Sequence, residues 1–289
     1  MITPGEWNRR GRFLDYRGER IFCIEEGEGP PLLLLHGFPT SSWDWCKIWP
    51  VLTKHYRCIA FDMIGFGFSA KPVEYEYSFF DQVDLHEELL LAMGLDSVHV
   101  LAHDYGDTVA QEWLARQAEG EARVSLKSVA MLNGGVIYGV HRPRLMQRLL
   151  VSPLGRFIGP RMSQRTFNRS FPPIFGAHTQ PTAEELDGYW EGIAHNNGPL
   201  VVHKLIRYLI ERKRHYKRWV PVLGNAPCAL QFIAGSDDPI SGAHMARAID
   251  ALGPERRSVV MEGIGHYPQM EAPDETLRHY FKFRESSCE

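Results

Sequence analysis

Short apolar runs alternate along the chain with longer segments in which apolar residues recur every three or four positions. The runs, clearest at residues 32–35, show no polar alternation, as expected for parallel strands that are covered on both faces. The longer segments have the spacing of amphipathic helices. This order predicts a doubly wound, mainly parallel α/β sheet. We expect strands at residues 12–16, 20–24, 32–35, 57–61, 98–101, 127–132, 228–234 and 258–261, and helices at 79–93, 107–117, 243–252 and 275–283.

The alternation of strands and helices stops after Asn133-Gly134-Gly135. Residues 136–220 are rich in arginine, proline and aromatic residues and show only helical patterns. Strand patterns return at residues 228–234, so the sheet resumes after the insertion. We therefore predict one core formed by residues 1–135 and 221–289, with residues 136–220 inserted as a helical cap. A chain of 289 residues, 44% of them hydrophobic, is long enough to bury such a core.

Composition argues against several classes of partner. The formal charge of -3, with acids and bases interspersed, gives no reason to expect nucleic acid binding. No apolar run approaches the ~20 residues of a membrane span, and residues 1–20 are too polar for a signal peptide. The five cysteines are odd in number and lack metal-binding spacing, which fits a reducing compartment. We expect a cytoplasmic protein with no metal and no cofactor.

Four motifs follow predicted strands, where open α/β sheets bind their ligands. The first is His-Gly-Phe-Pro at residues 36–39, in which a free backbone N–H after the glycine can point at an oxyanion. The second, at residues 62–69, has glycines that suit a tight turn, and we interpret it as scaffold. The third is His-Asp-Tyr-Gly at residues 103–106. The fourth is a pair of late loops, residues 235–239 and 263–268.

The third motif has the strand, turn and helix pattern of a nucleophile elbow, G-x-S-x-G, with Asp104 at the serine position. A serine needs a base to become nucleophilic, whereas an aspartate is ionised at pH 7 and can attack an sp³ carbon directly. The dipole and free N–H groups of the following helix keep the carboxylate anionic. The alternative is that Asp104 only caps this helix. The convergence of the other motifs on the same edge favours the nucleophile.

The four motifs, in this order and spacing, resemble the α/β-hydrolase superfamily over nearly the whole chain. The aspartate elbow resembles the branch that contains epoxide hydrolases and haloalkane dehalogenases. Within that branch the chain resembles the mesoderm-specific transcript proteins, which are usually classed with the epoxide hydrolases. Their signatures HDYGD-VAQE, NGG, HRP, HYPQ-E-P and an arginine-rich segment ending in RW correspond to residues 103–112, 133–135, 141–143, 266–273 and 212–219. The resemblance implies an α/β-hydrolase fold with a cap.

The resemblance also implies a catalytic triad in the order nucleophile, acid, histidine: Asp104, Asp238 and His266. Attack by Asp104 would give an alkyl-enzyme ester. His266, oriented by Asp238, would then activate water against the ester carbonyl. The backbone N–H groups of Phe38 and Tyr105 would hold the oxyanion that forms.

Neighbouring titratable residues have other interpretations. Asp237 is the alternative acid, but the family spacing, third after the glycine, favours Asp238. Asp107 lies one turn into the helix after the elbow, so we expect a surface or capping acid. His36 and His103 are expected to be structural supports of the oxyanion loop and the elbow.

The leaving group is the open question. Dehalogenases of this branch typically hold the halide with a Trp after the nucleophile and an Asn or second Trp elsewhere, whereas this chain has Tyr105 after it and Phe38 in the HG-x-P position. Epoxide hydrolases instead donate phenolic protons from cap tyrosines. Tyr208, in the helical stretch 200–212, resembles the second of these, and an ordinary place on an amphipathic helix is the alternative. For the first donor the sequence offers Tyr138, His141 and His178.

We therefore expect a cofactor-independent hydrolase that converts epoxides to vicinal diols. The alternatives are a haloalkane or haloacid dehalogenase and a catalytically silent binding protein on the same fold. The expected partners are a small apolar organic substrate and water, without nucleic acid or an integral membrane span, and a homodimer is left open. The basic run at residues 212–218 is interpreted as a solvated face, with contact to anionic lipid or an acidic substrate as the alternative.

Overall fold

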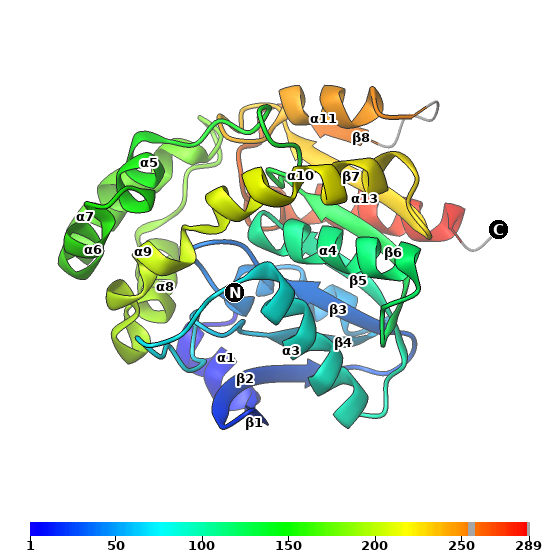
Figure 1. The fold of residues 1–289 in the computed structure, drawn as a ribbon, viewed down its shortest axis with the longest axis horizontal. Coiled ribbons are helices and arrows are strands. Elements are labelled where there is room, and N and C mark those ends of the chain that lie inside the picture. The colour runs from blue at the N-terminus through cyan, green and yellow to red at the C-terminus, as the bar shows by residue number, and fades with distance from the viewer. Residues whose placement is uncertain (254–257, 288–289) are drawn as a thin grey trace.

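The computed structural model describes residues 1–253 and 258–287, and these form an eight-stranded sheet covered by helices (Figure 1). The strands are β1 (Arg12–Tyr16), β2 (Glu19–Glu26), β3 (Pro31–Leu35), β4 (Arg57–Phe61), β5 (Ser97–His103), β6 (Ser125–Leu132), β7 (Ala229–Gly235) and β8 (Ser258–Met261). Their order in the sheet is β1-β2-β4-β3-β5-β6-β7-β8. The pairs β1–β2 and β2–β4 are antiparallel, and all others are parallel. The prediction of a mainly parallel α/β sheet is confirmed.

Side chains of the strands alternate between two hydrophobic clusters, one on each face of the sheet. Leu33 and Leu35 of β3 belong to the cluster that includes helices α3 (Phe79–Ala92) and α4 (Tyr105–Glu119). Leu32 and Leu34 belong to the other cluster, with residues of α1 (Pro4–Arg10) and α13 (Pro273–Ser286). All four leucines are fully buried. Burial on both faces is the reason that this run shows no polar alternation.

The helix α1 lies outside the predicted elements, although its start carries local signals. The hydroxyl of Thr3 accepts a hydrogen bond from the N–H of Glu6 at 3.2 Å, and Pro4 occupies the first helical position. Its buried residue Trp7 anchors it, because the indole N–H donates to Ser42 Oγ at 3.0 Å. The remaining core helices are η1 (Ser42–Trp45), α2 (Trp49–Leu52), α11 (Ala243–Asp250) and α12 (Pro268–Glu271).

Between β6 and β7 the chain forms helices and no strand, and this whole segment is described. They are α5 (Leu145–Val151), α6 (Gly155–Ile158), η2 (Gly159–Arg161), α7 (Gln164–Ser170), η3 (Pro172–Ile174), α8 (Ala183–Ala194), η4 (His195–Leu200), α9 (Val202–Leu205) and α10 (Tyr208–Gly224). Figure 1 shows α5 to α9 gathered at one end of the sheet, whereas α10 returns alongside α4, which it contacts. The insertion point agrees with the expected cap at residues 136–220, but α10 continues to Gly224. The division into core and cap stays a prediction.

The predicted single helical stretch at residues 200–212 is wrong in detail. The chain forms the short α9 and then starts α10 at Tyr208. The two are separated at Ile206 and Arg207, whose ψ angles of −13° and −9° are closer to a turn than to an α-helix. Tyr208 therefore stands at the first turn of a helix that also carries the basic run.

No helix in the described ranges combines the length and the apolar character that crossing a bilayer would require. Cys23, Cys46 and Cys58 are buried with free thiols, and Cys228 is a half-buried free thiol. Cys288 lies outside the described residues.

Candidate active site

Asp104 makes the turn between β5 and α4 by itself. Its φ of 47° and ψ of −98° are far from the regions that residues with a side chain prefer. The next turn is tight, since the N–H of Gly106 donates to the carbonyl of His36 at 3.0 Å and a Cβ at this glycine would lie 2.4 Å from the carbonyl oxygen of Leu35. Strained backbone of this kind is concentrated at functional sites. The sharp turn holds the Asp104 side chain at the carboxyl edge of the sheet.

The loop after β3 brings a backbone donor to this carboxylate. The N–H of Phe38 donates to Asp104 Oδ2 at 3.1 Å. Gly37 permits the approach, because a Cβ there would lie 2.6 Å from Nδ1 of His103. Tyr105 is the first residue of α4, so its N–H has no acceptor within the helix. The two backbone groups expected to form the oxyanion hole are thus near the carboxylate. The N–H of Phe38 contacts it directly, and Tyr105 is the next residue in the chain.

The structure brings Asp104, Asp238 and His266 together. The loop after β7 carries Asp238, and the loop after β8 carries His266, whose Nδ1 donates to Asp238 Oδ2 at 2.8 Å. Nε2 of the same imidazole lies 3.9 Å from Asp104 Oδ1, which is beyond hydrogen-bonding distance. All three side chains are buried. Nε2 therefore lies near the Asp104 carboxylate without forming a hydrogen bond to it.

Asp238 also accepts hydrogen bonds from donors other than His266. Its oxygens accept from Asn133 Nδ2 at 2.6 Å, from the N–H of Ile240 at 2.7 Å and from the N–H of Ser241 at 3.1 Å. Burial raises the pKa of Asp238, but the charge of His266 and these donors outweigh burial and leave the pKa below its usual value. Asp237 is exposed, and among the described residues its side chain accepts only from the adjacent Ser236 side chain, at 2.8 Å.

His266 lies between two carboxylates. Burial lowers the pKa of its imidazole, but the charge and hydrogen bond of Asp238, followed by the charge of Asp104, raise the pKa to about 9. The side chain is therefore an imidazolium at neutral pH in this state of the protein.

Two further histidines support the loops around the triad, as expected. Nδ1 of His36 donates to the carbonyl of Gly37 at 2.9 Å, and its Nε2 accepts from the N–H of Met63 at 3.0 Å. Nε2 of His103 lies 2.8 Å from the carbonyl of His266 and donates to it. Burial lowers the pKa of both rings, so both are neutral. They fix the backbone on which Phe38 and His266 stand.

The expectation that Asp107 is a surface or capping acid is wrong. The side chain is fully buried and accepts from the N–H of Leu132 at 3.3 Å. Burial, and after it the charge of Asp104, raises the pKa of Asp107 well above its usual value. The expectation fails because residues 105–115 of α4 are buried throughout, so this helix has no exposed face near its start.

The interpretation of residues 212–218 as a solvated face is wrong for Arg212, which is 4% exposed. Its Nε donates to Thr108 Oγ1 at 2.9 Å, and its Nη2 donates to the backbone carbonyl of Asp104 at 3.2 Å. The reason is that α10 packs on α4, which turns residue 212 inward. Lys213, Arg214 and Lys217 are exposed. Arg212 thus contacts the elbow from α10, a role that the sequence did not predict.

Tyr208 also faces the elbow and is not a residue of the exposed helix surface. Its ring is buried, with centroid distances of 5.5 Å to Phe38 and 5.4 Å to Tyr105. Its hydroxyl accepts from Gln147 Nε2 at 3.4 Å, and the guanidinium of Arg212 lies over the ring at 4.6 Å. Burial, followed by the charge of Asp104, raises the pKa of Tyr208, so the phenol keeps its proton at neutral pH.

Of the other proposed proton donors, Tyr138 and His178 are not brought to the triad, whereas His141 lies close enough for the charges of His266 and Asp238 to affect its pKa. Tyr138 is 45% exposed, and its ring packs outward against Tyr216 at 5.9 Å. His178 is exposed in the segment before α8. His141 is half-buried, and burial lowers its pKa to about 3. Tyr138 follows β6 by only a few residues, so it lies close to the sheet.

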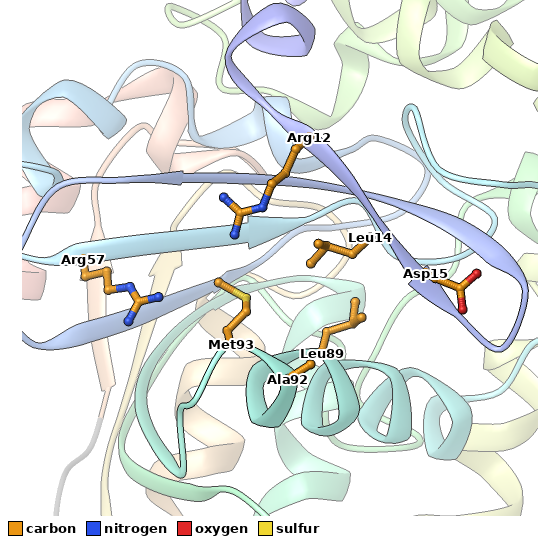
Figure 2. Close-up of a pocket in the computed structure, with 7 residues that line it drawn as sticks. All are labelled: Arg12, Leu14, Asp15, Arg57, Leu89, Ala92 and Met93. Carbon is orange, nitrogen blue, oxygen red and sulfur yellow. The ribbon is translucent and has the colours of Figure 1, made fainter.

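A cavity of about 420 Å³ lies elsewhere in the molecule (Figure 2). Arg57, which lines it, is the first residue of parallel strand β4, so this cavity lies toward the amino ends of the strands, opposite the triad loops. Two of its arginines already bind one carboxylate, since Arg12 and Arg57 both pair with Glu25 at 2.5 Å. We do not assign it to the active site. It is lined by Arg12, Leu14, Asp15, Arg57, Leu89, Ala92 and Met93.

Comparison with known proteins agrees with this architecture. Residues 30–273 match the family described as alpha/beta hydrolase fold. The mesoderm-specific transcript homolog protein of Bos taurus is 40% identical over 299 aligned positions, which cover 98% of this chain and 89% of that protein. The haloalkane dehalogenase DbeA from Bradyrhizobium elkani has a similar fold, with a TM-score of 0.79 at 22% identity over 96% of this chain and 99% of that chain. The epoxide hydrolase CorEH gives a TM-score of 0.76 at 18% identity over 94% and 97%.

Proposed function

Because the chain belongs to the α/β-hydrolase family, we propose that it is a cofactor-independent hydrolase in which Asp104 is the nucleophile and forms an alkyl-enzyme ester. One observation carries the proposal. The elbow residue is a carboxylate that has the Phe38 N–H on one oxygen at 3.1 Å and the His266 imidazole 3.9 Å from the other. A carboxylate needs no base to attack an sp³ carbon, so this arrangement suits alkyl transfer.

We propose epoxide opening as the first step. An oxygen of Asp104 attacks a ring carbon, the ring C–O bond breaks, and the departing oxygen takes the hydroxyl proton of Tyr208. The Tyr208 hydroxyl accepts from Gln147, which leaves its own proton uncommitted. The cation of Arg212 over the ring would stabilise the phenolate that forms.

The second step is hydrolysis of the ester. Neutral His266 takes a proton from water, and the hydroxide oxygen adds to the carbonyl carbon of the Asp104 ester. The oxyanion is held by the N–H groups of Phe38 and Tyr105. The bond between this carbon and the alcohol oxygen then breaks, and the proton of the new carboxyl group passes to that oxygen, which releases a vicinal diol and restores the Asp104 carboxylate. The proton held by His266 then restores the phenol of Tyr208. Asp238 keeps Nδ1 of the imidazole protonated, so that Nε2 is the atom that accepts the proton.

The side chains around Asp104 favour an epoxide over a halide as the leaving group. A halide needs donors that hold it as it departs, and the residue after the nucleophile is a tyrosine whose ring is packed against Phe79 at 4.5 Å. Phe38 offers only its backbone N–H. The phenol of Tyr208, by contrast, is a proton donor suited to an oxygen that would otherwise leave as an alkoxide. Dehalogenation of a haloalkane or haloacid remains the alternative, and a silent binding protein is the third.

A single-turnover reaction in ¹⁸O-water tests the covalent mechanism. The oxygen that enters the first product comes from Asp104, so the diol should be unlabelled in the first turnover and labelled in later ones. Label in the first product would refute the ester. A screen of aryl epoxides against short haloalkanes, with halide release measured and Asp104→Ala as the blank, decides the substrate class. Activity toward neither class would favour the silent protein.

The proton donor is tested by a matched pair of variants. Tyr208→Phe should lower the rate of epoxide opening by roughly 10²–10⁴, the usual contribution of a general acid. Tyr189→Phe is the control, because this cap tyrosine is also buried and its hydroxyl has no partner among the described residues. Its ring packs against Trp43 at 5.3 Å. Equal losses in both variants would contradict the role of Tyr208.

A further inference from the structure

The outer part of the cap carries an unusual concentration of positive charge. Residues 142–169 contain seven arginines and no acidic residue, although the chain as a whole has a formal charge of -3. The acid-free segment is longer still, extending from residue 122 to residue 183. Positive charge is therefore concentrated in this segment, although acidic and basic residues are nearly balanced over the whole chain. The seven are Arg142, Arg144, Arg148, Arg156, Arg161, Arg165 and Arg169.

All seven of these arginines are exposed. Within the described parts of the chain, none of them forms an ion pair. Two donate to backbone carbonyls of their own segment, Arg148 to Pro143 at 3.1 Å and Arg161 to Phe157 at 2.7 Å. By comparison, Arg218 on α10 pairs with Glu112 and Glu119. The positive charge of residues 142–169 is thus not neutralised by neighbouring carboxylates.

Large apolar side chains are exposed among these arginines. Leu145 is 73% exposed, Leu154 56% and Phe157 51%. Met146, next to Leu145, is also exposed. The guanidinium of Arg156 lies over the ring of Phe157 at 4.6 Å, so an apolar and a cationic group are presented together. Isolated exposed leucines are common on protein surfaces, but several large ones within a single cationic segment indicate an interaction site.

Except for Arg142, whose N–H donates to the carbonyl of Ile240 at 3.0 Å in the loop after β7, these residues lie at one end of the molecule. Leu145 and Arg148 are on α5, and Phe157 and Arg156 are on α6, which contacts both α5 and η2. Figure 1 shows α5, α6 and α7 together at the outer end of the cap, on the side opposite the C-terminus. We call the six arginines at residues 144–169 together with Leu145, Met146, Leu154 and Phe157 the cap arginine surface.

We propose that the cap arginine surface docks on an anionic lipid bilayer. Guanidinium groups bind lipid phosphates through paired N–H donors, and apolar side chains between them can enter the acyl boundary. Each cation near an anionic membrane strengthens binding about fivefold, so six unpaired arginines are a substantial attraction. A nucleic acid would use the arginines but would leave Leu154 and Phe157 in water. An acidic protein would be expected to need a more continuous apolar core than short helices with scattered apolar residues present.

Vesicle sedimentation with the full-length chain tests this proposal. The protein should bind vesicles of phosphatidylcholine that contain phosphatidylglycerol, with an affinity that falls as salt is added, and should bind phosphatidylcholine alone far more weakly. No binding to the anionic vesicles, or equal binding to neutral ones, would overturn the proposal. So would tighter binding to an RNA duplex than to the anionic vesicles.

Two sets of variants localise the contact. Changing Arg148, Arg156 and Arg165 to Gln should weaken binding on the order of a hundredfold. The matched control changes Lys213, Arg214 and Lys217 to Gln, which removes the same charge from exposed positions of α10. The control should lose little affinity, and an equal loss would show that net charge, not this surface, is responsible.

The second set tests the apolar part of the surface without altering charge. Leu154→Ser with Phe157→Ser should weaken binding to anionic vesicles on the order of tenfold, because both side chains would leave water on docking. Unchanged affinity in this double variant would overturn the insertion of apolar side chains. Circular dichroism and the thermal midpoint of each variant verify folding. Turnover of a water-soluble substrate should be unchanged in all of them, since none of these residues belongs to the triad or its supports.

Discussion

The charge of His266 has a measurable consequence for stability. The imidazolium lies between Asp238, 2.8 Å away, and Asp104, 3.9 Å away. His266→Gln removes this cation and leaves both carboxylates without it. We therefore expect the native protein to be more stable than the variant at mildly acidic pH and to lose that advantage as the pH rises.

The size and the direction of this effect follow from the pKa. A rise from the ordinary value of 6.5 to about 9 corresponds to about 3 kcal/mol of stabilisation of the imidazolium. Because the folded pKa lies above the unfolded one, this stability is fully present below pH 6.5 and is lost as the pH rises through about 9. At the acid end the lowered pKa of Asp238 acts in the opposite sense: its contribution is present above its ordinary value of 3.8 and is lost as the pH falls through its folded pKa.

The assay is thermal unfolding at about pH 6 and about pH 10, with the difference in midpoint between native protein and His266→Gln taken at each pH. A chain of this length has an unfolding entropy of about 0.6 kcal/mol/K, so about 3 kcal/mol corresponds to about 5 °C. The native advantage should therefore be about 5 °C larger at the lower pH. His178→Gln, an exposed histidine, is the control and should show no such change. A pH-independent difference for His266→Gln would refute the assignment of a charged resting imidazole.

Three other predictions concern the elbow and its neighbours. His266→Gln should slow ester hydrolysis by roughly 10²–10⁴, so that mass spectrometry after mixing with an epoxide finds an adduct on the peptide that contains Asp104; its absence would count against the covalent step. Arg212→Met should lower the free energy of unfolding by about 1–3 kcal/mol in denaturant titrations, because two buried oxygen acceptors at the elbow lose their donor, whereas Lys213→Met at the adjacent exposed position should be nearly neutral. Asp107→Asn should raise the thermal midpoint more at neutral pH than near pH 4, since the pKa of this carboxyl is raised and the native protein loses stability as the unfolded chain ionises above pH 3.8; an equal shift at both values would contradict the raised pKa of Asp107.

The sheet could be predicted closely because burial on both faces leaves a direct mark in the sequence. The strands expected at residues 12–16, 57–61 and 258–261 have the observed ends. The strands β2, β3, β5 and β6 are longer by one or two residues at an end, as β5 is where polar or small residues join the pairing without joining the apolar run, and β7 is shifted by one residue. The residues that the triad would need could also be found, because each follows a strand and the carboxyl ends of parallel strands meet at one edge.

The inward-facing polar residues could not be predicted, because a single sequence does not say which helix covers which. Arg212 contacts Thr108 across 104 positions of the chain, and the contact exists only because α10 packs on α4. The local pattern predicts that an arginine in a basic run is exposed to solvent, whereas Arg212 is buried by the packing of the two helices. One signal was present: Tyr208, Arg212 and Trp219 share one face of α10, and all three are buried. An arginine between two aromatic residues on one helix face indicates that this face packs against another part of the protein.

The resting charge of His266 raises a question about its proposed role, since a general base must be neutral before it can take a proton from water. The answer lies in the charge of Asp104. This carboxylate is one of the groups that raise the pKa of His266. When Asp104 becomes an ester, its negative charge disappears, and the imidazolium is left with Asp238 as its only close anion in the triad. The pKa of His266 then falls, which favours release of the proton. On this mechanism the base becomes available only after the first step has produced the ester that it is needed to hydrolyse.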